Sequence, residues 1–85
     1  MRRVLRLEVE GEFNLEELQK LTERLEEKLN AEFLGELYTD GVVLLPFKKG
    51  GEQIFLLPVI KVKSTEVEVY KLNKRELKKL GVEIE

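Results

Sequence analysis

Side chains able to carry out covalent or acid–base chemistry are scarce in this 85-residue chain, which has no cysteine and no histidine. Without thiols or imidazoles, disulfides, zinc fingers, cysteine nucleophiles and Ser-His relays are all excluded. Ser64 therefore has no imidazole to activate it, and Lys63 beside it would point to the opposite side of an extended strand. We predict no catalytic residue and expect a non-enzymatic protein.

Two glutamates have a spacing relevant to acid–base catalysis. Glu66 and Glu68 share one face of an expected strand about 6–7 Å apart, close to the separation of carboxylates in glycosidases. A general acid needs burial to raise its pKa, whereas this strand face is expected to be solvated. The single aspartate, Asp40, precedes Gly41 and is explained by a turn. No Asp-rich loop is present, so we predict no metal ligands.

The segment Lys48-Lys49-Gly50-Gly51 has the composition of a phosphate-binding loop but not its order. A P-loop needs Gly-x-x-x-x-Gly-Lys-Ser/Thr followed at once by a helix. We therefore interpret this segment as a flexible hairpin tip, and we predict no cofactor and no small-molecule ligand.

The distribution of charge is more informative than the net charge of −2. Residues 1–40 carry 6 basic and 11 acidic residues, whereas residues 41–85 carry 9 basic and 6 acidic ones. The basic residues of the second half form a candidate nucleic-acid-binding patch: Lys48, Lys49, Lys61, Lys63, Lys71, Lys74, Arg75, Lys78 and Lys79. Against this stand a pI of about 5.4 and the lack of an aromatic RNA-binding motif.

Composition sets the broad class. The chain is 42% hydrophobic and 38% charged, and its charge is carried mainly by Glu, Lys and Arg, as in proteins of hyperthermophiles. The length predicts a single domain spanning residues 1–85. No apolar run approaches the roughly 18 residues of a membrane span, so we expect no membrane association and a cytoplasmic protein.

A helix is predicted from Leu15 to about Asn30. Asn14 suits the N-cap, Glu17 can complete a capping box, and Phe13 can pack on Leu18. The apolar stripe is only about 120° wide and lasts about two heptads, which favours packing on a sheet over a coiled coil. Its members are Leu15, Leu18, Leu21, Leu25 and Leu29.

The segment Phe33–Lys48 is predicted to form a hairpin around Asp40-Gly41, a pair favoured in type I′ turns. Pro46 lacks a ladder donor, so its strand is expected to be an edge or to bulge there. This turn pairs Thr39 with Val42, Leu37 with Leu44 and Phe33 with Lys48 on one face, and Tyr38 with Val43, Glu36 with Leu45 and Leu34 with Phe47 on the other.

A second hairpin is predicted, with Lys48–Gln53 as its loop and Ile54–Lys63 as the next strand. Pro58 follows two leucines, as Pro46 does. Two one-sided strands are predicted at Arg3–Val9, ended by Gly11, and at Glu66–Tyr70. In the latter, Val67 and Val69 are expected to face inward, and Glu66 and Glu68 to face solvent.

A second helix is predicted to begin after Asn73, with Glu76 at N3, and to stop at Gly81. Val82–Glu85 could add a short edge strand. The predicted order is β-α-β-β-β-β-α-(β), which defines a small two-layer α+β sandwich. Its sheet is expected to be mainly antiparallel, with one long amphipathic helix packed on one face.

The central strands carry apolar residues on both faces, and one helix covers only one face. The second helix offers little apolar cover, although it could close the other face by itself. An uncovered apolar face usually marks an interaction surface. The candidate interaction face consists of Leu34, Tyr38, Val43, Leu45, Phe47, Phe55, Leu57 and Val59.

Three functions are compatible with these patterns. We expect a small protein-interaction module that forms a homo-oligomer or binds a protein partner. The alternative is binding of RNA or DNA through the basic patch. A small enzyme is the third.

Overall fold

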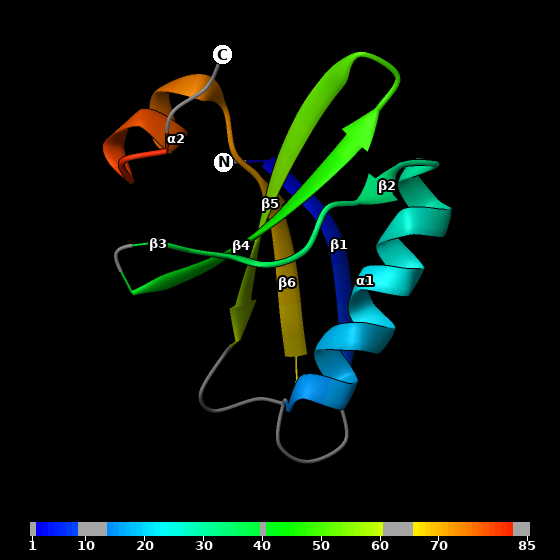
Figure 1. Ribbon diagram of the computed structural model, residues 1–85. Coiled ribbons are helices and arrows are strands. Elements are labelled where there is room, and N and C mark those ends of the chain that lie inside the picture. The colour runs from blue at the N-terminus through cyan, green and yellow to red at the C-terminus, as the bar shows by residue number, and fades with distance from the viewer. Residues whose placement is uncertain (1, 9–13, 40, 61–65, 83–85) are drawn as a thin grey trace.

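The protein is a small α+β domain with a six-stranded antiparallel sheet and two helices. The computed structural model describes residues 2–8, 14–39, 41–60 and 66–82. The sheet order is β1-β6-β5-β4-β2, and β3 also pairs with β4 (Figure 1). In chain order the elements are β1 (Arg2–Glu8), α1 (Leu15–Leu29), β2 (Glu32–Phe33), β3 (Leu37–Thr39), β4 (Val42–Lys49), β5 (Glu52–Ile60), β6 (Glu66–Lys71) and α2 (Lys74–Lys79).

The predicted fold class is confirmed, with one strand more than expected before α2 because the first arm of the predicted hairpin is divided into β2 and β3. The predicted strand at Val82–Glu85 is not formed at Val82, and its remaining residues lie outside the described ranges. Val9, Gly11 and Phe13, for which roles were predicted, also lie outside the described ranges.

Helix α1 has the predicted N-cap and ends at the predicted residue, but of the predicted capping box only the bond to the Asn14 side chain is among the described hydrogen bonds. The side chain of Asn14 accepts a hydrogen bond from the backbone N–H of Glu17 at 3.0 Å, and Asn30 ends the helix in the left-handed conformation. The leucine stripe packs on the sheet through Leu18, Leu21 and Leu25. The prediction for Leu15 is wrong: its side chain is exposed, because the first turn of α1 lies beside an opening in the sheet.

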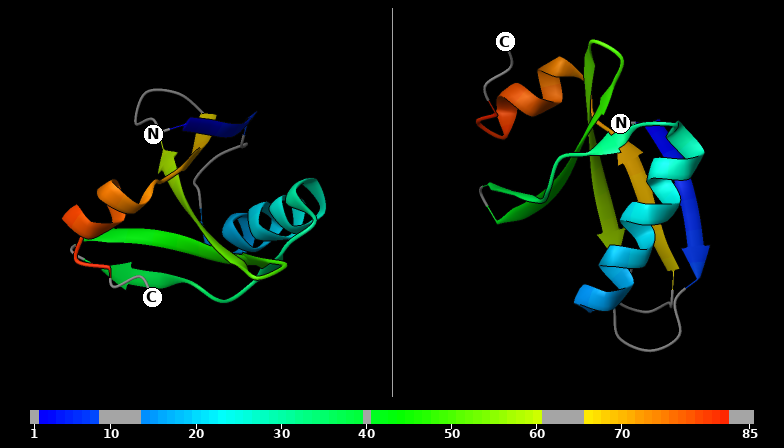
Figure 2. Two further views of the ribbon diagram at one scale, coloured as in Figure 1. Left: turned by 90° about the horizontal axis from the view of Figure 1, so that it is seen from above. Right: turned by 45° about the vertical axis from the view of Figure 1, so that its right-hand side comes forward.

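The two helices lie on opposite faces of the sheet (Figures 1 and 2). One buried cluster includes residues of α1 and the other includes Leu77 of α2. The second cluster confirms that the C-terminal helix closes part of the second face. The cluster under α1 contains Leu5, Leu18, Leu21, Leu25, Leu45, Phe47, Ile54, Leu56, Val67 and Val69. The cluster under α2 contains Leu44, Phe55, Leu72 and Leu77.

The hairpin between β4 and β5 is tighter than predicted. Both strands run to the turn, with Lys49 opposite Glu52, so Gly50 and Gly51 alone form the loop. The predicted six-residue loop, Lys48–Gln53, is therefore wrong. A two-residue turn pairs odd-numbered positions of β4 with even-numbered positions of β5, as in Phe47 opposite Ile54. Consequently Phe47 and Phe55 face opposite sides of the sheet.

The predicted register of the other hairpin holds near its turn and then slips by one residue. Leu37, Tyr38 and Thr39 pair with β4 as predicted, but Phe33 lies opposite Phe47, with ring centroids 5.2 Å apart. The predicted pairs Phe33–Lys48 and Leu34–Phe47, and the strand pair Glu36–Leu45, are not formed. The extra residue lies in segment 34–36, where Gly35 has a φ of 93°.

Strand β6 buries a carboxylate that the sequence places in solvent. Val67 and Val69 point into the core as predicted, but Glu68 is only 5% exposed. Its carboxylate accepts a hydrogen bond from the hydroxyl of Tyr70. Glu66 is half-buried and forms an ion pair with Arg6 of β1. The prediction that Glu68 faces solvent is wrong, because partners supplied by neighbouring side chains allow it to be buried.

Helix α2 is short, and both of its ends are capped. Asn73 and Glu76 form the predicted capping box, with bonds of 2.9 and 3.1 Å. At the other end Gly81 has a φ of 78°, and the N–H of Val82 donates to the carbonyl of Leu77. This is a Schellman motif, so Gly81 ends the helix as predicted.

Strand β1 lies at one end of the described strand order. Its register with β6 shifts between Arg3 and Leu5, so Val4 is an irregular position. The carbonyl of Val4 accepts a hydrogen bond from Nζ of Lys28 in α1, at 2.9 Å. A backbone acceptor of this edge strand is therefore already occupied by a side chain.

Replacement of Gly35 by alanine tests the origin of the register slip. A Cβ at Gly35 or at Gly51 meets no atom within 4 Å, but only Gly35 of this pair has a positive φ. We expect Gly35→Ala to lower the free energy of unfolding by about 1 kcal/mol because of backbone strain. Gly51→Ala, the matched control, should change it by less than about 0.5 kcal/mol. Urea titration measures both, and equal effects would show that the conformation of Gly35 is not what the slip requires.

The cap of α2 predicts an acid-sensitive helix. The hydrogen bond from the backbone N–H of Asn73 lowers the pKa of Glu76 below its ordinary 4.5, with a smaller contribution from Lys79. A lowered folded-state pKa means that this bond stabilises α2 fully above pH 4.5 and is lost as the pH falls through the folded-state pKa. Amide chemical shifts of α2, followed by NMR from pH 6 to 2.5, should show this transition in the wild type. Glu76→Gln, which keeps the capping geometry, should not show it.

Candidate functional site

Proline positions explain where the β4–β5 ladder stops. The carbonyl of Phe55 accepts a bond from Leu72, so odd-numbered residues of β5 turn their backbone groups towards β6, and even-numbered ones towards β4. Continuing the β4–β5 register would place Pro58 opposite Val43, but the paired region ends at Leu45 and Leu56. Pro58 has no N–H to give, so the ladder cannot continue through it.

Pro46 has the corresponding role on the other side of β4. Its carbonyl accepts a hydrogen bond from Leu34 at 3.0 Å, so its backbone nitrogen also faces the first hairpin arm. The proline nitrogen, which has no hydrogen to donate, thus faces segment 34–36, the gap between β2 and β3. Strand β4 is paired on both sides, so it is no edge, and the extra residue lies in the opposite segment 34–36. The prediction that the strand of Pro46 is an edge or bulges there is therefore wrong, although the ladder beside it is interrupted.

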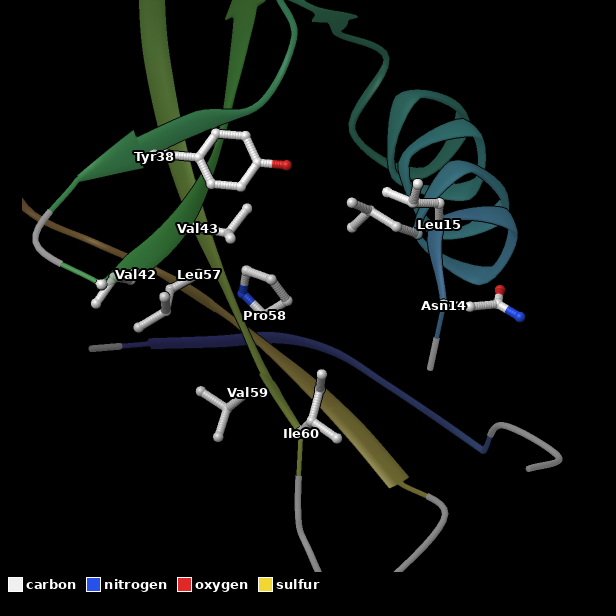
Figure 3. Close-up of a pocket in the computed structure, with 11 residues that line it drawn as sticks. Asn14, Leu15, Tyr38, Val42, Val43, Leu57, Pro58, Val59 and Ile60 are labelled. Atoms are coloured by element: carbon white, nitrogen blue, oxygen red, sulfur yellow. The ribbon is translucent and has the colours of Figure 1, made fainter. Parts of the chain in front are cut away.

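The divergence of β4 and β5 opens a groove of about 760 Å³. Its walls are the β3–β4 hairpin, the C-terminal half of β5 and the first turn of α1 (Figures 1 and 3). Because the gap passes between two strands, residues from both faces of the sheet border it. The lining consists of Asn14, Leu15, Leu18, Tyr38, Gly41, Val42, Val43, Leu57, Pro58, Val59 and Ile60. We call this set the groove.

Large apolar side chains project at the rim of the groove. Leu15 is 77% exposed, Tyr38 68% and Ile60 51%, and they come from α1, β3 and β5. Figure 3 shows the ring of Tyr38 extending from β3 towards α1, with Val43 and Pro58 beside it and Leu15 across the opening. Three of the five exposed large hydrophobic residues among the described ranges thus meet at one place.

The groove offers contact area and little reactive chemistry. None of the described lining residues is charged, and the side-chain oxygen of Asn14 is already engaged by the N–H of Glu17. The phenol of Tyr38 supplies a hydroxyl at the rim. Within the described ranges, no three acidic side chains gather closely enough to hold a metal ion. The arrangement is therefore suited to binding an apolar surface.

The predicted interaction face is divided by the structure. Tyr38, Val43, Leu57 and Val59 line the groove. Leu45 and Phe47 are buried under α1, and Phe55 under α2, so these three are unavailable to a partner. Leu34 is exposed but lies outside the groove. The prediction of a single face fails because it groups odd-numbered residues of both strands. The pairing of Phe47 with Ile54 instead places odd-numbered residues of β4 on the same face as even-numbered residues of β5.

Sequence reasoning misses other residues of the groove. The leucine stripe assigns Leu15 to the helix core, and strand periodicity alone gives Pro58 and Ile60 no special role. The sequence signal for Pro58 is present, since a proline within an apolar strand interrupts the ladder.

The predicted basic patch is also divided. All of its described members are exposed. However, Lys48 of β4 is paired with Glu32 on the neighbouring strand β2, and Lys49 is paired with Glu52 on β5. The hairpin tip that carries these two lysines is separated from α2 (Figures 1 and 2). Lys61, Lys63 and Ser64 lie outside the described ranges.

Comparison with protein-family models, curated proteins and solved structures finds no match to this chain. Neither described helix is long and apolar enough to cross a membrane.

Restoring the missing donor tests the role of Pro58. In Pro58→Ala the new N–H faces Val43, so we expect the ladder to extend and the groove to narrow. NMR should show a cross-strand contact between residues 43 and 58 and an amide at position 58 that exchanges at least about tenfold more slowly than an open one. Pro46→Ala is the control, because its N–H faces segment 34–36. A freely exchanging amide at position 58 would contradict this role.

Proposed function

We propose that this protein is a self-associating interaction module, and that the groove of one copy binds the groove of a second copy. The observation that carries the proposal is the meeting of Leu15, Tyr38 and Ile60 around one apolar opening. Exposed apolar side chains gathered in one patch are typical of binding surfaces.

The patch is suited to a copy of itself. A two-fold interface brings the same surface of both subunits together, so it needs projections and hollows in one patch. Tyr38 and Ile60 project beside a hollow bordered by Val43, Leu57 and Pro58. Because no described lining residue is charged, two identical grooves can face each other without opposing like charges at their centre.

The mass in solution tests the proposal. At 10 to 100 μM we expect sedimentation equilibrium to give twice the 9.9 kDa of the chain, with dissociation on dilution. A monomeric mass throughout this range would refute self-association.

Charged substitutions locate the interface. Tyr38→Glu and Ile60→Glu should each weaken association at least about tenfold, because an unpaired carboxylate would be buried at the contact. Leu34→Glu is the matched control: Leu34 is 45% exposed and lies outside the groove. Circular dichroism and thermal melting establish that each variant is folded. If Leu34→Glu disrupts the dimer as strongly as the groove variants do, the interface lies elsewhere.

A further inference from the structure

Basic side chains gather where β1 begins, β6 ends and α2 follows. Arg2 lies directly opposite Lys71 across the ladder, and Arg3 lies opposite Tyr70. Only two residues separate Lys71 from α2, and the ribbon places α2 beside the start of β1 (Figures 1 and 2). The cations of α2 therefore follow directly on this pair in the fold. We call the set the basic end: Arg2, Arg3, Lys71, Lys74, Arg75, Lys78 and Lys79, all exposed.

The pairing of Arg2 with Lys71 runs against the stability of the sheet. Like charges directly opposite each other on neighbouring strands are destabilising. The described ion pairs join Arg6 to Glu66 and Lys20 to Glu17, and none involves the basic end. An unfavourable local arrangement without an evident structural benefit is more common at functional sites than elsewhere.

The acid nearest in sequence to the cations of α2 also has a structural role. Glu76 is the one acidic residue between Lys71 and Lys79, and its carboxylate accepts the backbone N–H of Asn73. Its role in capping holds it at the start of α2. Among the described residues of β6 from Lys71 onward and of α2, five cations thus accompany one carboxylate, and Arg2 and Arg3 add two more cations.

The structure changes the composition of the basic surface that the sequence predicts. It adds Arg2 and Arg3, which come from the acidic half of the chain and are placed by the β1–β6 pairing. It removes Lys48 and Lys49, which lie across from glutamates at the separate hairpin tip. The result is a smaller and more uniformly positive surface than the predicted one.

We propose that the basic end binds the phosphate backbone of double-stranded nucleic acid. A row of phosphates matches several cations distributed over two strand ends and a helix, and the guanidinium groups of Arg2, Arg3 and Arg75 suit bidentate phosphate contacts. Tyr70, the aromatic side chain among these residues, is half-buried and donates to Glu68, so it offers no stacking platform. Binding is therefore independent of base sequence and needs no unpaired bases.

This surface is distinct from the one that serves self-association. None of its seven residues lines the groove. A two-fold dimer carries two basic ends, so self-association would increase the affinity for a long duplex without being required for contact with a short one.

Binding of a short duplex tests the proposal. The probe is a fluorescent 20-base-pair DNA duplex of arbitrary sequence, titrated with the full chain from 50 to 200 mM salt, with an RNA duplex of the same sequence in parallel. Contacts to about four phosphates predict a slope of log K against log salt near −3.6 for DNA. The triple variant Lys74→Gln, Arg75→Gln and Lys78→Gln should weaken binding at 50 mM salt at least about tenfold and reduce the slope by about 2 to 3.

Matched controls show whether duplex binding depends on the basic end. Lys48→Gln with Lys49→Gln removes two lysines at the hairpin tip and should leave both affinity and slope unchanged. Tyr38→Glu should also leave the intrinsic affinity for the short duplex unchanged, so failure of self-association and failure of this proposal give different results. Helical content of the triple variant is checked by circular dichroism, since glutamine retains good helix propensity.

Three results would overturn the proposal. The first is no binding to either duplex at 50 mM salt with 100 μM protein. The second is equal binding by the wild type and the triple variant. The third is equally tight binding to poly-glutamate or to vesicles of anionic phospholipid, which would show general adsorption of polyanions in place of nucleic-acid binding.

Discussion

The constraint on which the architecture depends is the inability of a proline to donate a backbone hydrogen bond. Strands β4 and β5 each contain one proline, and the two proline nitrogens, which cannot donate, face different neighbouring segments of the chain. Pro46 faces the first hairpin arm, where β2 ends and β3 begins. Pro58 faces the continuation of β4, where pairing ends at Leu45. Strands β4 and β5 are therefore paired near their turn and separate towards the β3–β4 hairpin.

This division explains why so small a domain has two buried clusters. Near the glycine turn, β4 and β5 are paired, and their inner faces pack under α1 through Phe47 and Ile54. Farther along, β4 leaves β5 and carries Leu44 to the cluster under α2. Thr39 of β3 donates to the carbonyl of Leu80, at 3.0 Å, which ties the diverging hairpin to the C-terminal helix. The groove is the space that these two packing arrangements leave between them.

Features determined by residues close in sequence could be predicted, and those determined by cross-strand register could not. The caps at Asn14 and Asn73 depend on positions within four residues, and both are present. The placement of Phe55 depended on the pairing of β4 with β5, because residues directly opposite each other share a face and Phe47 lies opposite Ile54. Burial of Glu68 required the hydroxyl of Tyr70 and a covering environment that period-two alternation does not reveal. The groove was predicted only in part for the same reason, since it joins residues from both faces of the sheet.

The margins of the sheet have a consequence for how the protein behaves at high concentration. One margin is β1, with its irregular position at Val4, the bond from Lys28 and the charges of Arg2 and Arg3. The other is formed by β2 and β3, of two and three residues, too short to template a long strand. Neither edge favours edge-to-edge pairing with a strand of another chain, the route by which sheets grow into fibrils. A β-rich chain with an exposed apolar opening is thereby protected from open-ended polymerisation.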